Sequence, residues 1–121
     1  MKYGLLFGDT KDRARQWEAM PDAQREAAYA PINRWFEKYG SKITGGHELQ
    51  PERTATTVTF NNGKPVVTDG PFIEGKETIG GYAEVTVADL DEAIEMAKAW
   101  PTGGPVEVRP VVERSESLHN G

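Results

Sequence analysis

The sequence predicts a single α+β domain, a split β-α-β repeat that carries an inserted β-hairpin. Near the N-terminus, Tyr3, Leu5 and Phe7 recur at every second position, which is the period of a strand. Two later segments place apolar residues three and four positions apart, as on one face of a helix. Asn62-Gly63 joins two alternating, β-branched segments and is typical of a tight hairpin turn. The resulting order is strand, helix, strand, hairpin, strand, helix, strand.

Length and composition favour one soluble globular domain. The chain has 121 residues, of which 37% are hydrophobic and 27% charged, and this length gives a real core without room for a second domain. We expect the domain to occupy residues 1–113 and the polar residues 114–121 to form a flexible tail. The uncharged apolar runs fall far short of the roughly 20 residues that cross a bilayer, so no membrane contact is expected.

Several classes of function lose support from the same numbers. A net charge of −5 disfavours a nucleic-acid partner, and the absence of cysteine excludes disulfides and thiolate chemistry. The sequence lacks a Walker A motif, a dinucleotide-type glycine fingerprint, a Gly-x-Ser-x-Gly segment and an HExxH helix. The first residues lead directly into a strand without a signal-peptide pattern. We therefore expect a cytoplasmic protein without a bound cofactor or metal.

The first half of the chain predicts a strand over 2–8 and a helix that starts at Pro21. Residues 13–20 fit either a short helix or an ordered loop that turns Trp17 inward. Pro31 removes a backbone donor, which predicts a kink or a restart of the long helix, and Gly40 predicts a left-handed cap at its end. One apolar helical face is expected to cover the sheet: Ala28, Ile32, Trp35, Phe36 and Tyr39.

The second half predicts three more sheet segments and a helix. Gly45-Gly46 lies inside a strand over 43–49, which indicates a bulge or a close backbone approach. Asp89 caps the second helix, with Glu92 placed for the reciprocal bond. The hairpin spans 54–68, and the last strand spans 106–112. The strand over 79–87 and the second helix each have an apolar side: Ile79, Gly81, Ala83, Val85 and Val87, and Leu90, Ala93, Ile94, Ala97 and Trp100.

The segment Val67-Thr68-Asp69-Gly70-Pro71-Phe72 is the part of the chain that core packing explains least. Glycine permits unusual backbone angles and proline restricts its predecessor, so Asp69 is expected at an abrupt bend after the hairpin. The carboxylate fits two roles equally well. It is either an Asx-turn former that accepts the backbone N–H groups of Gly70 and Phe72, or a site residue. Glu74, Lys76 and Glu77 follow closely and are candidates for substrate contacts, with a solvated charge cluster as the alternative.

Four motifs, in the order in which they occur along the chain, resemble the DGPF branch of the YCII-related proteins. The set consists of Thr-Asp-Gly-Pro-Phe-x-Glu-x-Lys-Glu at 68–77, Gly-Gly-Tyr at 80–82, Asp-Leu-Asp-Glu-Ala at 89–93 and Val-Glu-Val-Arg-Pro at 106–110. The resemblance extends from about residue 2 to residue 113. It implies a ferredoxin-like α+β unit that pairs into a dimeric α/β barrel, and it implies no particular reaction.

His47, Arg53 and Arg109 complete the candidate site. His119 falls in the predicted tail, so His47 is the one imidazole expected in the folded part. If its strand lies beside the hairpin, Asp69 can orient the ring for acid–base chemistry; a surface histidine is the alternative. The family resemblance implies a histidine in the helical part instead, where this chain has Asn33, Arg34 and Trp35. Arg53 and Arg109 can bind an anion or pair with a carboxylate such as Glu107 or Glu84.

Two helices over a four-stranded sheet leave one face of the sheet without a cover. Tyr82, Glu84 and Thr86 are expected on that face with Glu107 and Arg109, and a second copy of the chain can cover it. The sequence therefore predicts a homodimer. Three functions fit: an enzyme or binding protein for a small polar molecule in a cleft at the dimer interface, a non-catalytic accessory of an extracytoplasmic-function sigma factor response, as the resemblance implies, or a dimerising unit without a ligand.

Overall fold

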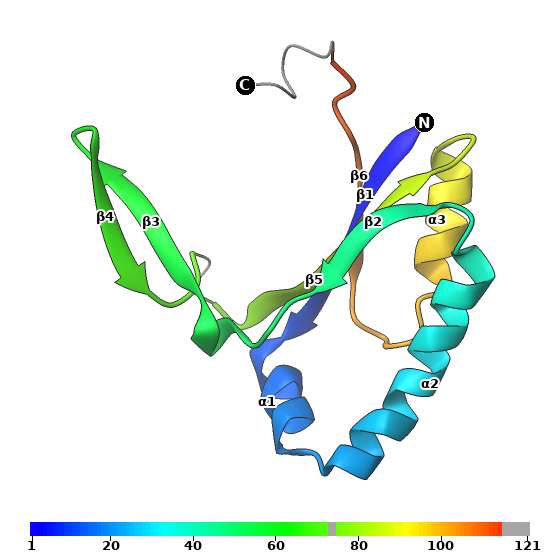
Figure 1. Cartoon of the computed structure of the whole chain (residues 1–121), viewed down its shortest axis with the longest axis horizontal. Helices are drawn as coiled ribbons and strands as arrows, with labels where there is room; N and C mark the ends of the chain where they lie inside the picture. Colours follow the sequence, from blue (N-terminus) through cyan, green and yellow to red (C-terminus); the bar gives the residue numbers. More distant parts are fainter. Residues whose placement is uncertain (73–74, 115–121) are drawn as a thin grey trace.

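The computed structural model describes residues 1–72 and 75–114. Strand β1 (Lys2–Thr10) leads through helix α1 (Lys11–Ala19) into helix α2 (Asp22–Tyr39), and five strands, a 3-10 helix and a third α-helix follow (Figure 1). These are β2 (Ile43–Glu48), the 3-10 helix η1 (Glu52–Thr54), β3 (Thr56–Asn61), β4 (Lys64–Asp69), β5 (Glu77–Thr86), α3 (Leu90–Lys98) and β6 (Val106–Pro110). The predicted tail beyond Arg114 lies outside the described residues. Among the described helices, none combines the length and apolar character that a bilayer crossing requires.

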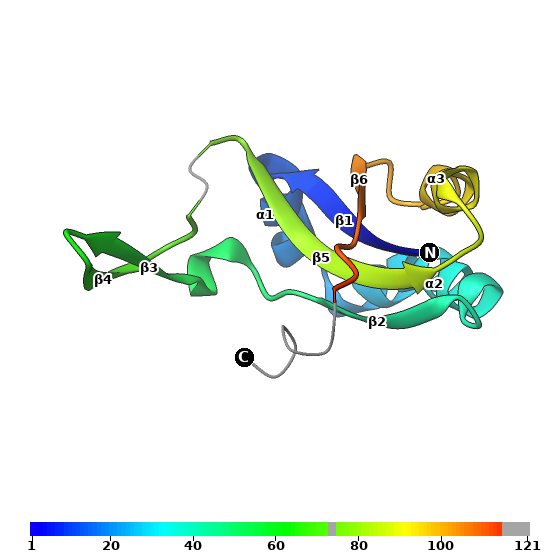
Figure 2. The same cartoon turned by 90° about the horizontal axis from the view of Figure 1, so that it is seen from above.

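The main sheet has four strands in the order β2-β5-β1-β6, with every neighbouring pair antiparallel. This order is compatible with a ferredoxin-like α+β fold, in agreement with the predicted split β-α-β repeat. Strands β3 and β4 form a separate two-stranded sheet. Both views show this hairpin as an arm that projects away from the main sheet (Figures 1 and 2).

One face of the main sheet packs on the helices. Tyr3, Leu5 and Phe7 of β1 are buried there with Ala83 and Val85 of β5. The helices contribute Trp35, Ala93 and Met96 to the same cluster. The apolar residues at every second position of β1 and β5 thus face the core, as the sequence predicted.

Trp35 of α2 is the aromatic centre of this core. Its ring packs edge-to-face against Phe7 and Trp100, with ring centroids 5.9 and 5.0 Å apart. Its indole N–H donates to the carbonyl oxygen of Met96 at 2.9 Å. That carbonyl lies in the last turn of α3, where helices leave acceptors without intrahelical partners. Trp35 therefore joins α2 to α3 by both packing and a hydrogen bond.

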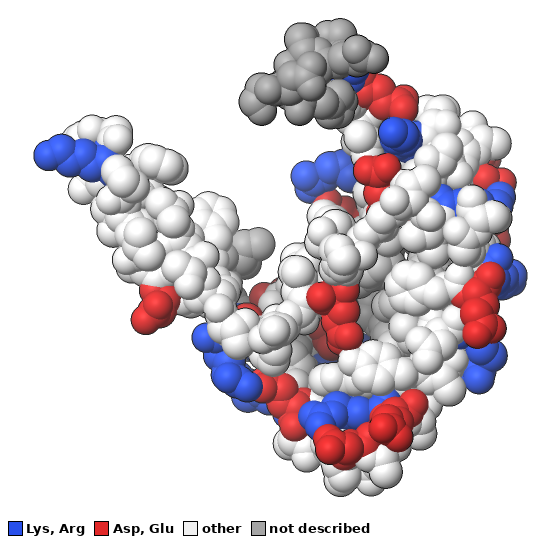
Figure 3. Space-filling model, in the orientation of Figure 1, with Lys and Arg blue, Asp and Glu red and all other residues white. Residues whose placement is uncertain are grey.

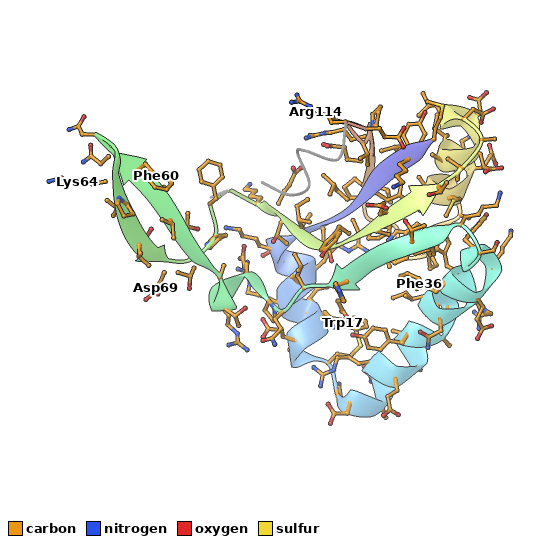
Figure 4. All side chains as sticks on the ribbon, turned by 45° about the horizontal axis from the view of Figure 1, so that its top comes forward. Trp17, Phe36, Phe60, Lys64, Asp69 and Arg114 are labelled. Atoms are coloured by element: carbon orange, nitrogen blue, oxygen red, sulfur yellow. The ribbon has the colours of Figure 1, made fainter. Side chains whose placement is uncertain are left out.

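Helices α1 and α2 decide between the two alternatives for residues 13–20 and differ from two other expectations. Residues 11–19 form a helix, and Trp17 lies between α1 and α2, with its ring 5.1 Å from that of Tyr29 (Figure 4). Of the two outcomes predicted at Pro31, a kink or a restart, the restart is wrong, because α2 continues through Pro31. The predicted left-handed cap is also wrong, since Gly40 keeps right-handed helical angles. The Lys42 N–H, which donates to the Tyr39 carbonyl at 2.9 Å, closes the turn without positive φ.

The glycines of β2 behave as the sequence predicted. The register between β2 and β5 shifts between Ile43 and Gly45, which is the bulge. Gly46 adopts φ +134°, and a Cβ placed there would lie 2.3 Å from the carbonyl oxygen of Tyr82. The glycine thus lets β2 approach β5 closely. Gly81 serves the same contact from the other side, because its Cβ would lie 3.0 Å from the carbonyl oxygen of His47.

Two apolar patterns were predicted only in part. Ile79 is 41% exposed, because the register between β1 and β5 shifts at Gly80 and pairs Ile79 with Gly8 instead of continuing the core face. In α3, Leu90 is 46% exposed, whereas Met96, which the pattern missed, is fully buried. The cap itself is confirmed: the Asp89 carboxylate accepts the Glu92 N–H at 2.9 Å.

Candidate functional site

The bend after the hairpin has the predicted backbone. Asp69 ends β4 and Gly70 follows with φ +107°. The N–H of Gly70 donates to the carbonyl of Ala55 at 2.8 Å, and its carbonyl accepts the hydroxyl of Thr57 at 2.7 Å. The predicted bond from this N–H to the Asp69 carboxylate is therefore absent. The bend is held by Ala55, which follows η1, and by Thr57 of β3 rather than by an Asx turn.

Asp69 itself lies in solvent. The side chain is exposed, and in Figure 4 it extends away from the main sheet. Among the residues that the structure describes, none donates a hydrogen bond to its carboxylate. The residue is thus available for a contact with a ligand or partner, while the backbone around it is fixed.

A groove of about 490 Å³ lies directly behind this bend. It separates the base of the arm from the main sheet, and Pro71 and Phe72 form part of its wall. The described residues around it come from four stretches of chain: Leu49, Gln50, Pro51 and Glu52; Thr54, Ala55, Thr56 and Thr57; Pro71 and Phe72; and Thr78 and Ile79. The lining is mostly apolar, with hydroxyl, amide and carboxylate groups between the apolar side chains.

The floor of the groove is tied to α1 by two ion pairs. Glu52 places one carboxylate oxygen 3.4 Å from the ammonium of Lys11, and this oxygen is buried without a hydrogen bond among the described groups. Arg53 donates two hydrogen bonds to Glu18, at 3.0 and 2.8 Å. Arg53, a predicted anion ligand, is therefore engaged with a carboxylate of α1 and positions the base of the arm.

His47 lies on the uncovered face of the main sheet. It stands opposite Tyr82 in the register, with ring centroids 6.2 Å apart. The assumption that its strand lies beside the hairpin is wrong, because β2 pairs with β5 and the hairpin forms its own sheet. In the part of the chain that the structure describes, no pair of neighbouring strands joins His47 to Asp69.

The uncovered face carries the polar groups that alternation predicted. Tyr82 and Glu107 both flank Leu6, and Glu84 and Arg109 both flank Gly4 in the register. Three strands, β2, β5 and β6, contribute an imidazole, a phenol, two carboxylates and a guanidinium to this face: His47, Tyr82, Glu84, Glu107 and Arg109.

Two ion or hydrogen-bond pairs order this face. Arg109 lies 2.5 Å from Glu107 of the same strand, so the predicted carboxylate partner is present. The hydroxyl of Thr44 donates to the Glu84 carboxylate at 2.8 Å. Thr44 was not among the predicted site residues, because the contact of its hydroxyl with β5 depends on how two distant strands pair.

Lys76 and Glu77, the remaining predicted site residues that the structure describes, do not converge on Asp69. Lys76 is exposed and accepts, through its backbone carbonyl, the N–H of Lys11 at 2.7 Å. Glu77 begins β5 opposite Thr10. Glu74 lies outside the described residues.

One contact on the helical side was also missed. The hydroxyl of Tyr29 in α2 donates to both oxygens of Glu48 in β2, at 2.9 and 3.0 Å. Burial, and then the hydrogen bond to Glu48, raise the pKa of Tyr29 above its ordinary value. The contact joins α2 to an edge strand, and no local signal could have predicted it across 19 residues.

Fold and site together define an α+β protein with an uncovered sheet face and a groove at the base of a projecting arm. The YCII-related domain matches residues 1–115, and the chain belongs to this family. A similar protein from Rhizobium meliloti (strain 1021), called uncharacterized protein R00369, is 30% identical over 115 residues, which cover 92% of each chain.

Proposed function

We propose that this protein binds a small polar molecule in the groove behind the Asp69-Gly70-Pro71-Phe72 bend, and that a second copy of the chain closes the site. The groove carries the proposal. Its volume of about 490 Å³ falls in the range of small-molecule pockets, which are typically concave and mostly apolar with a few polar groups. We also place the chain in the DGPF branch of the family on the Asp69-Gly70-Pro71-Phe72 motif, of which Pro71 and Phe72 line the groove.

The polar groups of the lining indicate which hydrogen bonds a ligand can form in the groove. The hydroxyls of Thr54 and Thr57 already donate to the backbone carbonyls of Pro51 and Gly70. Thr56, Thr78 and Gln50 therefore supply the hydrogen bonds to the ligand, while apolar side chains hold its body. Asp69 precedes the wall residue Pro71 by two positions and does not line the groove, so it is the proposed charged contact for a ligand group that extends beyond the groove.

The second copy enters the proposal through the uncovered sheet face. Tyr82 is 43% exposed there, and no helix of the described chain covers this face. A sheet face of this kind is stabilised when another layer packs on it. Pairing of two such faces around a twofold axis gives the dimeric α/β barrel, and it places His47 and Arg109 near the interface.

A thermal-shift screen of small polar metabolites tests the proposed site. A ligand at 100 times its dissociation constant stabilises the folded state by about 2.7 kcal/mol. Ala55→Leu adds bulk to the lining and is expected to abolish the shift. The control Thr59→Leu adds a leucine on the same hairpin at a position that does not line the groove, and is expected to keep it. Equal shifts in both variants, or no shift in the wild type with any compound, would contradict the proposal.

A further inference from the structure

The hairpin arm, defined as Thr56–Asp69, has one apolar and one mainly polar face. Val58 pairs with Val67, and Phe60 pairs with Pro65. Directly paired residues project to the same side of a sheet, so these four side chains share one face. Asp69 lies on this face too, at its base, because it follows Val67 by two positions. The other face carries Thr57, Thr59, Thr68 and Val66.

The apolar face has no cover within the described part of the chain. Val58, Phe60 and Val67 are 50%, 72% and 66% exposed. The two strands contact chiefly each other, and Phe60 and Lys64 lie far from the main sheet (Figure 4). In Figure 3 the arm is a largely uncharged projection. An isolated two-stranded hairpin is only marginally stable in water, so an arm of this length calls for a partner surface.

We propose that the apolar face of the arm docks on a second copy of this chain, so that the two copies of a twofold dimer exchange arms. In a twofold dimer the same contact occurs twice, and each arm meets the same surface of the other copy. The inference deepens the dimer of the proposed function and rests on it. It adds a second contact surface, separate from the uncovered sheet face.

The exposed area favours a second copy over an unrelated partner. Val58, Phe60 and Val67 of the arm and the 79% exposed Phe72 just beyond its base together offer on the order of 400 Å² of apolar surface. Each arm covers an equal area of its receptor, so two exchanged arms bury roughly 1,600 Å², the size of a standard stable interface. A single arm on an unrelated protein buries about half of that, below the usual lower limit of about 1,200 Å².

Charge and rigidity agree with this partner. Lys64 at the tip and Asp69 at the base are the charged residues of the arm, and their charges cancel. A neutral arm meets little repulsion from a second chain of net charge −5. The base is fixed by the Ala55–Gly70 hydrogen bond and by the Arg53–Glu18 pair. The arm is thus presented in one direction, which lowers the entropy cost of docking.

Adjacent valines provide a matched test. Val67 lies on the apolar face and Val66 on the opposite face, and both are exposed. The oligomeric state of the full chain is measured by sedimentation equilibrium for the wild type, Val67→Lys and Val66→Lys, with circular dichroism as the check on folding. We expect a wild-type dimer, a dissociation constant weaker by at least about tenfold for Val67→Lys, and an unchanged dimer for Val66→Lys.

The outcomes separate this inference from the proposed function. If Val67→Lys dimerises as tightly as the wild type, or if both variants weaken the dimer equally, arm docking is overturned while groove binding stands. If no metabolite binds but Val67→Lys alone dissociates the dimer, the proposed function fails and arm docking is supported. A wild-type monomer at every concentration overturns both, and would assign the arm to a different partner.

Discussion

Gly46→Ala is expected to destabilise the protein strongly, whereas Gly45→Ala is expected to have almost no effect. An added Cβ at Gly46 would lie 2.3 Å from the carbonyl oxygen of Tyr82 and 2.6 Å from the Cα of Ala83. Both atoms belong to the backbone of β5, so neither can rotate away. The position also has φ +134°, which side chains with a Cβ rarely adopt. At Gly45 a Cβ would meet no atom within 4 Å.

The magnitude follows from two separate costs. Strain at an unfavourable backbone conformation is worth about 1–3 kcal/mol, and forcing extra volume into a packed contact costs about 1–3 kcal/mol. Gly46→Ala should therefore lower the free energy of unfolding by about 2–6 kcal/mol, a large fraction of the roughly 5–15 kcal/mol of a typical domain. Gly45→Ala should stay within about 0.5 kcal/mol, as for an exposed substitution without special contacts.

Urea unfolding followed by tryptophan fluorescence measures both variants against the wild type. The approach of β2 to β5 also sets His47 opposite Tyr82, so Gly46→Ala is expected to disturb the uncovered sheet face as well. Equal losses in the two variants would refute the reasoning, since the clash and the positive φ occur at one glycine only. A loss below about 0.5 kcal/mol for Gly46→Ala would refute it too.

Three further predictions concern single side chains. Asp69→Ala should change the free energy of unfolding by less than about 0.5 kcal/mol. Asp89→Ala should lower it by about 0.5–2 kcal/mol, because this variant removes a helix cap. If thermal unfolding shows comparable losses for the two variants, Asp69 has the turn-former role after all. Trp35→Phe should cost about 1–3 kcal/mol in urea unfolding, because it leaves a buried carbonyl of α3 without its donor; an unchanged midpoint would contradict this. The hydrogen bond from Lys42, and then the N–H of Ala88, hold the pKa of Glu92 below its ordinary value of 4.5. The stabilisation by the Glu92 carboxylate is thus present above that ordinary value and lost as the pH falls through the lowered pKa. The stability difference between wild type and Glu92→Gln should therefore shrink as the pH falls below 4.5, and a difference that does not change with pH would argue against the charge.

The elements of the fold that the sequence determined are those specified by neighbouring residues. Asn62 and Gly63 adopt φ 51° and 79°, the positive angles that a two-residue hairpin turn requires. Asp89 caps α3 through a bond that spans three residues. Gly70 bends the chain after Asp69 because its own backbone permits φ +107°. Each of these outcomes depends on a few consecutive residues, so a sequence pattern was sufficient.

Only the tertiary structure decided how those elements meet. The engagement of Arg53 with Glu18, 35 residues earlier, could not be predicted, because it depends on a contact between distant segments. The sequence predicted an inserted hairpin, but not the direction in which it projects from the main sheet (Figures 1 and 2). The same holds for the groove: the sequence predicted the bend before Pro71, but not that the segment after β2 forms the opposite wall. Local conformational preferences fixed the individual elements, whereas packing over long sequence separations placed them around the candidate site.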